Sequence, residues 1–198
     1  ACRHTPLLFP VCAKDIVFMV DVSSIVLVQE RLDIVRTLFE VIQNLEIGMD
    51  DNLVALYGYD TEVHEIFDLQ SYLTKTSVLH HIQSSGLLSS LDTKRTDTDA
   101  AVQFLVDSAL TSQHGDRVNF ADAVVIFGDS VTAHNTHVTV SNRLALEQIS
   151  RDVIVVSVGS GSTNDNLATD RNHILHVPSS SSFDTVLVPK LLELLKQC

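Results

Sequence analysis

The sequence predicts an α/β fold, a doubly wound and mostly parallel sheet with one antiparallel edge strand and helices on both faces. Three observations favour this class. Near-continuous apolar runs recur along the chain, which is typical of parallel strands buried on both faces. Amphipathic segments with apolar residues three and four positions apart lie between these runs, as crossover helices would. Two short strand-like segments separated by only two residues predict a hairpin at one edge of the sheet.

Composition indicates one acidic, folded domain. The chain has 198 residues, 45% of them hydrophobic, which is enough for a sizeable core and too apolar for disorder. Its 25 acidic and 13 basic residues give a net charge of −12, and this argues against nucleic acid because phosphate binding needs clustered Lys and Arg. The apolar runs are far shorter than the ~20 residues of a membrane span, so we expect no membrane insertion. We expect a linker over residues 1–13 and the domain over 14–198.

The first half of the chain supplies the start of the sheet. Residues 15–21 form an apolar run between two aspartates and are predicted to be a strand buried on both faces. Apolar residues at helical spacing predict a helix over 32–45, which Gly48 can end. Segments 53–59 and 62–67 are predicted to form the edge hairpin, and we expect the tyrosines on the first of them to be half-buried.

The second half of the chain continues the alternation of helices and strands. Helices are predicted over 74–84 and 99–110, and a second fully buried strand over 121–127. The serine run 179–182 is a predicted helix entry. The remaining predicted elements are a helix over 138–149, strands over 152–158 and 174–177, and a final amphipathic helix over 183–196.

Cysteines lie only near the two ends of the chain. Cys2 and Cys12 precede the first strand, and Cys198 is the last residue. In a fold whose termini emerge together, a bond from either of them to Cys198 would close the domain as one loop, which the chain-entropy model values at about 5 kcal/mol. The alternative is three free thiols in a reducing compartment. The odd count suggests a partner cysteine elsewhere, and without an initiator Met or a signal-peptide core we expect a segment of a larger protein.

Polar side chains gather where the predicted parallel strands end. In sheets of this class, ligands bind beyond the carboxyl ends of the strands. Asp21 and Ser23 follow the first strand, a Thr-Asp-Thr-Asp loop begins at Thr96, and Asp129 follows the strand over 121–127. Their oxygen atoms suit Mg²⁺, Mn²⁺ or Ca²⁺ better than zinc. The alternative is that these residues, the loop from Thr96 to Asp99 above all, only cap helices.

This arrangement resembles the von Willebrand factor A family, also called the integrin inserted-domain fold. The family's metal-ion-dependent adhesion site has the pattern Asp-x-Ser-x-Ser after the first strand, a Thr in a Thr-x-Thr loop and a later Asp. Asp21, Ser23, Thr96 and Asp129 match these positions. The resemblance covers nearly the whole chain and implies an interaction module in which these four residues hold Mg²⁺ or Mn²⁺ for a partner's acidic side chain.

Several positions depart from the family pattern. Ile25 stands where the second serine is expected, which removes one hydroxyl ligand from a cation that tolerates poor geometry badly. Lys94 and Arg95 replace the usual Gly-Gly and would disfavour a cation if they pointed inward, and Ser130 replaces the glycine that follows the last Asp. The site is therefore a degenerate one, and a metal-free structural or assembly domain is the alternative.

The subfamily resemblance is to the A domains of type VI collagen and similar matrix proteins. The run from Asp15 to Asp21, the strand leading to Leu69 and the flanking cysteines carry this resemblance. It implies a secreted extracellular matrix module whose partners are matrix proteins or sibling chains, with its end cysteines joined. An intracellular A-domain scaffold with reduced cysteines is the competing interpretation.

Other signals for chemistry are weak. The loop from Gly159 to Thr163 imitates a dinucleotide fingerprint but lacks its third glycine and lies late in the chain. His134 and His137 after Asp129 have His-x-x-His spacing, which alone is a weak zinc signal. No Gly-x-Ser-x-Gly elbow is present, so we expect no enzymatic activity.

Overall fold

The computed structural model describes residues 12–23, 26–85, 87, 95–129, 138–150, 152–158, 165–177 and 183–197, with only the backbone described at 129 and 184. Its strands form one six-stranded sheet in the order β3-β2-β1-β4-β5-β6. The β2–β3 pairing is antiparallel and the other pairings are parallel, as predicted. The strands are β1 (Lys14–Asp21), β2 (Leu53–Tyr59), β3 (Val63–Phe67), β4 (Ala121–Asp129), β5 (Asp152–Val158) and β6 (Ile174–Val177).

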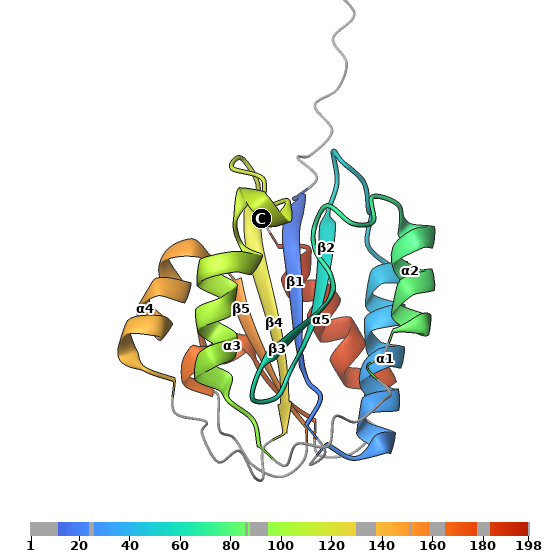
Figure 1. Ribbon diagram of the computed structural model, residues 1–198. Helices are drawn as coiled ribbons and strands as arrows, with labels where there is room; N and C mark the ends of the chain where they lie inside the picture. Colours follow the sequence, from blue (N-terminus) through green and yellow to red (C-terminus); the bar gives the residue numbers. More distant parts are fainter. Residues whose placement is uncertain are drawn as a thin grey trace, which may run out of the picture.

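Helices cover both faces of the sheet. Helices α1, α2 and α5 lie on one face, and α3 and α4 lie on the other (Figure 1). This confirms the doubly wound, three-layer architecture that the alternation of apolar runs and amphipathic segments predicts. The helices are α1 (Val28–Gln43), α2 (Lys75–Ser84), α3 (Thr98–Phe104), α4 (Val140–Ile149) and α5 (Val188–Leu195).

Strand β1 is the centre of two hydrophobic cores. All eight of its residues are buried, and its side chains alternate between the faces of the sheet. Ile16, Phe18 and Val20 pack toward α1, α2 and α5, whereas Val17 and Met19 pack toward α3 and α4. Each fully buried apolar side chain of this size contributes about 1.5–3 kcal/mol to folding. Because both faces of this strand are buried, its sequence is an uninterrupted apolar run, which made the strand predictable.

Several expectations for the elements need correction. Tyr57 and Tyr59 are fully buried, not half-buried, because β2 lies inside the sheet with helices over both faces. Helix α1 begins at Val28, before the predicted 32, because the Glu30 side chain accepts a hydrogen bond from the backbone N–H of Leu27 at 2.8 Å. Leu32 itself is 40% exposed and so does not face the core.

Two predicted helices change their geometry along their length. The segment predicted as a helix over 99–110 is α3 followed by a wide turn over Leu105–Ala109, closed by a bond from the N–H of Leu110 to the carbonyl of Leu105. The final helix likewise starts with a wide turn over Phe183–Leu187 and continues as α5. Leu105, Ala109, Phe183 and Leu187 are buried in these turns, whereas Val186, expected on the apolar face of the final helix, is 60% exposed.

The two ends of the described chain lie at the same end of the sheet. Helix α5 runs back from the carboxyl ends of the strands and finishes near the start of β1 (Figure 1). Cys12 is disulfide-bonded, and its partner lies outside the described residues. The linker expected over 1–13 also lies outside them, except for its last two residues. Among the helices that are described, none is long and apolar enough to cross a bilayer.

Candidate metal-binding site

Asp21, the last residue of β1, is the hub of a polar cluster at the carboxyl edge of the sheet. Its side chain is buried, and its two oxygens accept from different segments of the chain. Oδ1 accepts a hydrogen bond from the backbone N–H of Ser23 at 2.9 Å, and Oδ2 accepts one from the Thr96 hydroxyl at 3.0 Å. The structure therefore brings three of the predicted site residues together, although Thr96 lies 75 residues after Asp21.

The loop that carries Thr96 is fixed by its neighbour. The backbone N–H of Asp97 donates to the carbonyl of Asp60 at 2.7 Å, and the Asp97 carboxylate caps α3 by accepting from the N–H of Ala100 at 3.0 Å. The carboxylate of Asp99 accepts from the N–H of Thr139 at the start of α4 at 2.8 Å. The helix-capping interpretation thus holds for Asp97 and leaves the hydroxyl of Thr96 for Asp21.

Ser23 offers an oxygen atom without a partner. Its side chain is completely buried, and its Oγ makes no hydrogen bond. Its carbonyl accepts instead, from the N–H of Val26 at 3.2 Å and from the guanidinium of the buried Arg31 at 3.3 Å. A buried hydroxyl without a hydrogen-bond partner lowers the stability of the fold by about 1–3 kcal/mol, so a ligand that binds it would recover that cost. A hard cation beside Asp21 and Thr96 would satisfy it, and the residues present fit such a cation.

Asp129 ends the strand next to β1. Val20 pairs with Phe127, which puts Asp21 and Asp129 at the ends of adjacent strands. The side chain of Asp129 is outside the description, so its part in the site stays a prediction. Arg95 is exposed, so it does not put a positive charge into the cluster.

Some of the positions singled out in the sequence fall outside the described residues, so the structure does not show where they lie. Among them are three of the residues that depart from the family pattern and the two weak motifs. These positions are Ile25, Lys94, Ser130, His134, His137, the loop over 159–163 and the serines over 179–182.

Two supporting residues were missed at the sequence level. Burial, followed by the negative charge of Asp21, raises the pKa of Tyr59 well above its ordinary value, so its phenol keeps its proton and donates to the carbonyl of Phe127 at 3.4 Å. Arg31 lies three residues before Ile34 and seven before Leu38, on the face of α1 that packs on the sheet. An arginine at an otherwise apolar helical spacing was the signal that could have revealed it.

The opposite edge of the sheet holds a second acidic group. The β1–β4 register pairs Asp15 with Asp122, and Asp116 comes close enough that carboxylate oxygens of all three lie within 4.8 Å of one another. Arg117 neutralises part of this charge through its contact with Asp15 at 2.6 Å. Burial, and then the neighbouring Asp116, raise the pKa of Asp122 to about 8. This cluster therefore holds a proton at neutral pH and differs from the site predicted at the carboxyl edge.

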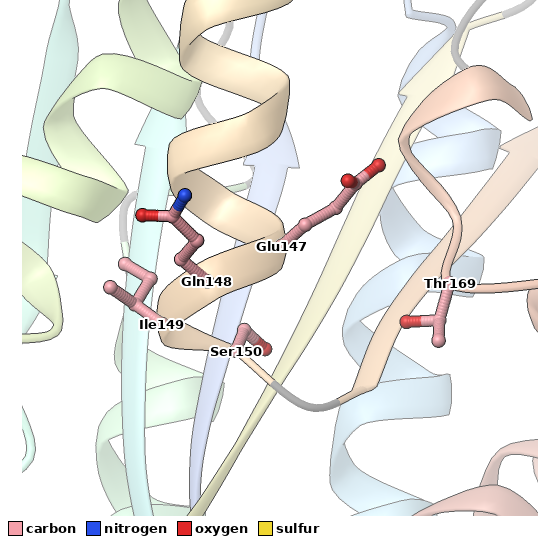
Figure 2. A pocket seen from close by; sticks show the side chains of 5 residues that line it. All are labelled: Glu147, Gln148, Ile149, Ser150 and Thr169. Atoms are coloured by element: carbon pink, nitrogen blue, oxygen red, sulfur yellow. The ribbon is translucent and has the colours of Figure 1, made fainter.

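A hollow beside the end of α4 has no convergent chemistry. Figure 2 shows it lined by Glu147, Gln148, Ile149, Ser150 and Thr169. The Ser150 hydroxyl contacts the carbonyls of Asp122 and Asp152, and Glu147 pairs with Arg143 at 3.0 Å. The polar groups of Ser150 and Glu147 are thus used in local contacts, and the carboxyl edge is the better candidate for function.

Family comparison agrees with the fold. Residues 15–188 match the model of the von Willebrand factor type A domain, which spans most of the chain. The chain therefore belongs to the von Willebrand factor type A domain family.

Curated relatives include proteins whose names point to matrix and adhesion. The chain is 31% identical to chicken (Gallus gallus) matrilin-1 over 117 residues, which is 59% of this chain and 22% of that protein. It is 27% identical to the mouse (Mus musculus) collagen alpha-4(VI) chain over 121 residues, 59% of this chain and 5% of that one. The match to the Caenorhabditis elegans transmembrane cell adhesion receptor mua-3 is 31% over 112 residues, 54% of this chain and 3% of the receptor. The chain thus spans less than a quarter of each of these three relatives.

Solved structures share the fold. Proximal thread matrix protein 1 from the mussel byssus superimposes with a TM-score of 0.79 at 18% identity, covering 93% of this chain and 48% of that one. A second structure of it has a zinc-occupied metal-ion-dependent adhesion site, with a TM-score of 0.78, 16% identity, and 92% and 48% coverage. Manganese-loaded Plasmodium vivax TRAP protein matches with a TM-score of 0.71 at 15% identity, covering 94% and 75%.

Proposed function

We propose that this domain is a non-enzymatic interaction module of the extracellular matrix that binds matrix proteins or sibling chains through a degenerate metal-ion-dependent adhesion site. Asp21, Ser23, Thr96 and Asp129 form that site, and Mg²⁺ or Mn²⁺ is its ion. The observation that carries the proposal is the buried, unpartnered Oγ of Ser23 beside the Asp21 carboxylate that already holds Thr96. The similarity to matrilins and a collagen VI chain supports the matrix setting.

The four residues of the site have different roles in holding the ion. Ser23 and Thr96 would hold the ion through their hydroxyl oxygens, and the two aspartates would hold it directly or through water. Asp21 also orients the site, because its oxygens fix the backbone of Ser23 and the hydroxyl of Thr96. A bound divalent ion supplies Lewis acidity for a carboxylate of the partner.

A metal-free assembly domain is the second candidate. The observation that favours it is the sequence departure at Ile25, which removes one oxygen ligand, together with the hydrogen bonds that already engage both oxygens of Asp21. In this case the same fold would join sibling chains through other surface patches.

We also infer a disulfide between Cys12 and Cys198, with the domain over residues 14–198. The return of α5 to the start of β1 supports this pairing, as does the disulfide-bonded state of Cys12. A disulfide favours a secreted protein over an intracellular scaffold. A peptide map of the non-reduced protein should contain the Cys12–Cys198 peptide, whereas a Cys2–Cys12 peptide would overturn the pairing, and three titratable thiols would favour the scaffold.

Binding to immobilised matrix proteins tests the adhesion proposal. The chain is applied to a panel of collagens and matrilins in Mg²⁺, in Mn²⁺ and in excess chelator. We expect binding that the chelator and Thr96→Ala abolish and that Thr76→Ala, on an exposed face of α2, leaves unchanged. Binding that survives both the chelator and Thr96→Ala would favour the metal-free assembly domain.

A further inference from the structure

A buried arginine lies beside the polar cluster at the carboxyl edge of the sheet. Arg31 belongs to the first turn of α1, the end of that helix that lies at this edge (Figure 1). Only 3% of the residue is exposed. Its Nη1 donates to the carbonyl of Ser23 at 3.3 Å, and the N–H of the same serine donates to the Asp21 carboxylate at 2.9 Å. Ser23 therefore contacts both the guanidinium and the carboxylate.

The positive charge of Arg31 has no paired carboxylate. Its Nε is buried without a hydrogen-bond partner, and none of the described carboxylates forms an ion pair with it. Arg36, on the same helix, differs because its side chain is 56% exposed and pairs with Asp33 at 3.5 Å. An arginine is rarely buried without such a pair, since taking its charge out of water is costly. A buried charge is screened little, so that of Arg31 acts on the polar cluster beside it.

Fixing the loop after β1 is the alternative role for Arg31. Its bond to the Ser23 carbonyl is long at 3.3 Å, compared with about 2.9 Å for a typical bond of this kind. The same carbonyl also accepts from the N–H of Val26 at 3.2 Å, and Asp21 holds the N–H of Ser23. The backbone of Ser23 thus keeps two hydrogen bonds without Arg31. Anchoring alone does not explain why a charged side chain stands here.

Opposite charges lie on the two sides of Ser23. The Asp21 carboxylate and the Arg31 guanidinium are both 97% buried, and two buried charges of opposite sign offset part of each other's cost of burial. Arg31 therefore stabilises the cluster whether or not an ion binds. Of the two basic residues that the sequence places near the site, Arg95 is exposed and Lys94 lies outside the described residues.

We propose that Arg31 is a built-in positive charge that lowers the affinity of the adhesion site for divalent cations. The proposal rests on the proposed function, because it concerns the same site. An ion held by the hydroxyl of Ser23 would share that residue with the guanidinium, and the two positive charges would repel each other. A guanidinium stays protonated in proteins, so the repulsion is permanent.

This repulsion links the ion to the partner. A carboxylate of the partner is attracted by the ion and by Arg31 alike, and its negative charge offsets the repulsion between them. The ion and the acidic partner would therefore bind more tightly together than either binds alone, and the coupling is reciprocal. The site fills at high metal concentration or together with a partner.

Titration of the full chain with Mn²⁺ by calorimetry tests the proposal with two neutral replacements. Arg31→Gln removes the charge and keeps an amide that can donate to Ser23, whereas Arg31→Met keeps only an apolar stem. We expect both variants to bind Mn²⁺ about tenfold or more tightly than the parent chain, because a single charge no longer opposes the ion across a buried residue. Arg36→Gln is the matched control. It removes the same charge from an exposed place on the same helix, so its affinity should stay that of the parent.

Two further measurements show where the gain arises. Adding Thr96→Ala to Arg31→Gln should abolish the gain, because Thr96 belongs to the adhesion site. Urea unfolding at one fixed Mn²⁺ concentration should show a larger stabilisation of Arg31→Gln than of the parent chain, as tighter binding requires. An anchoring role predicts the opposite sign, since a loosened Ser23 would bind the ion less well.

Mn²⁺ affinity that is equal to or weaker than that of the parent in both folded variants would overturn the proposal. So would a gain that survives Thr96→Ala or that Arg36→Gln reproduces, and so would folded variants that bind no Mn²⁺. A parent chain without measurable binding, beside variants that bind through Thr96, would support it. Matrix binding that survives the chelator is a separate result, because it counts against metal-dependent adhesion and not against the effect of Arg31 on Mn²⁺ affinity.

Discussion

Ser23 has a completely buried side chain whose hydroxyl makes no hydrogen bond. If that hydroxyl exists for a cation, Ser23→Ala should separate stability from metal binding. In excess chelator we expect the free energy of unfolding to stay equal or to rise by up to about 1 kcal/mol, because an unsatisfied polar group is removed. Added Mg²⁺ should stabilise the parent chain, by about 2.7 kcal/mol at a hundred times the dissociation constant, and fail to stabilise the variant. Urea unfolding with and without Mg²⁺ measures both quantities, and equal stabilisation of the two proteins would count against the site.

Ile25 is the residue at which the sequence departs most from the family's metal pattern. Ile25→Ser would restore a hydroxyl ligand, so we expect Mg²⁺ to bind about tenfold or more tightly. Ile25→Val is the matched control, because it shortens the side chain without adding an oxygen. Calorimetric titration compares the three proteins. Equal affinities in the serine and valine variants would mean that position 25 does not contribute a ligand.

The meeting of Asp21, Ser23 and Thr96 at the carboxyl edge was predictable from the sequence, whereas the contacts of His114 with Glu65 and Asp68, at 3.6 and 3.7 Å, were not. Asp21 and Thr96 follow apolar strands or precede a helix, so the fold class alone sends them to one edge. Glu65, Asp68 and His114 come from an edge strand, a loop and a short 3₁₀ helix, and each looks like an ordinary surface residue. Their meeting depends on backbone contacts such as that between Leu69 and His114, which no local pattern encodes.

Among the elements, the segment before β4 is fastened to the rest of the sheet by Arg117. Its guanidinium donates to Asp15 at 2.8 Å and to the carbonyls of Met49 and Asp51 at 2.7 and 2.8 Å. Arg117→Met would leave the completely buried Asp15 without its cation, and we expect a loss of about 3–5 kcal/mol in the free energy of unfolding. Arg171→Met is the control, because Arg171 is exposed. Chemical denaturation at neutral pH measures both, and a loss in Arg117→Met no larger than in the control would refute this anchoring role.

The strands were easier to predict than the helices for a physical reason. Burial on both faces leaves β1, β4 and β5 with uninterrupted apolar runs, and their predicted bounds lie within two residues of the observed ones. Helix ends depend on single capping bonds. The bond between Leu27 and Glu30, for example, lets α1 begin earlier in the chain than apolar spacing predicts. The wide turns next to α3 and α5 bury Leu105, Ala109, Phe183 and Leu187, although Val186 is 60% exposed, so apolar spacing alone does not reveal them.

For the whole molecule, the acidic cluster at the amino ends of the strands links stability to pH. The folded-state pKa of Asp122 is raised to about 8 from 3.8, chiefly by burial and then by Asp116. Asp15, whose pKa burial also raises, and Arg117 complete the set of charged groups around it. A raised folded-state pKa means that the folded chain holds the proton more tightly than the unfolded chain. Its stabilising effect is therefore complete below about pH 4 and is lost as the pH rises through about 8.

Asp122→Asn removes this dependence on pH. We expect the parent chain to lose about 1–2 kcal/mol between pH 5 and pH 9, a figure reduced from the full shift because Asp122 is partly exposed to solvent. The variant should lose less over the same interval and be the more stable protein at pH 9. Urea unfolding at the two pH values gives the comparison. A parent chain whose stability rises with pH in this window would show that Asp122 is ionised in the folded state.

The most direct measurement is a calorimetric titration with Mn²⁺ of the full chain and of Asp129→Ala. If separate strands and loops bring Asp21, Ser23, Thr96 and Asp129 around one ion, the parent chain binds a single equivalent and the variant shows no binding at that site. Identical Mn²⁺ isotherms for the two folded proteins would contradict the account, because the adhesion site would then not include the residue that ends β4.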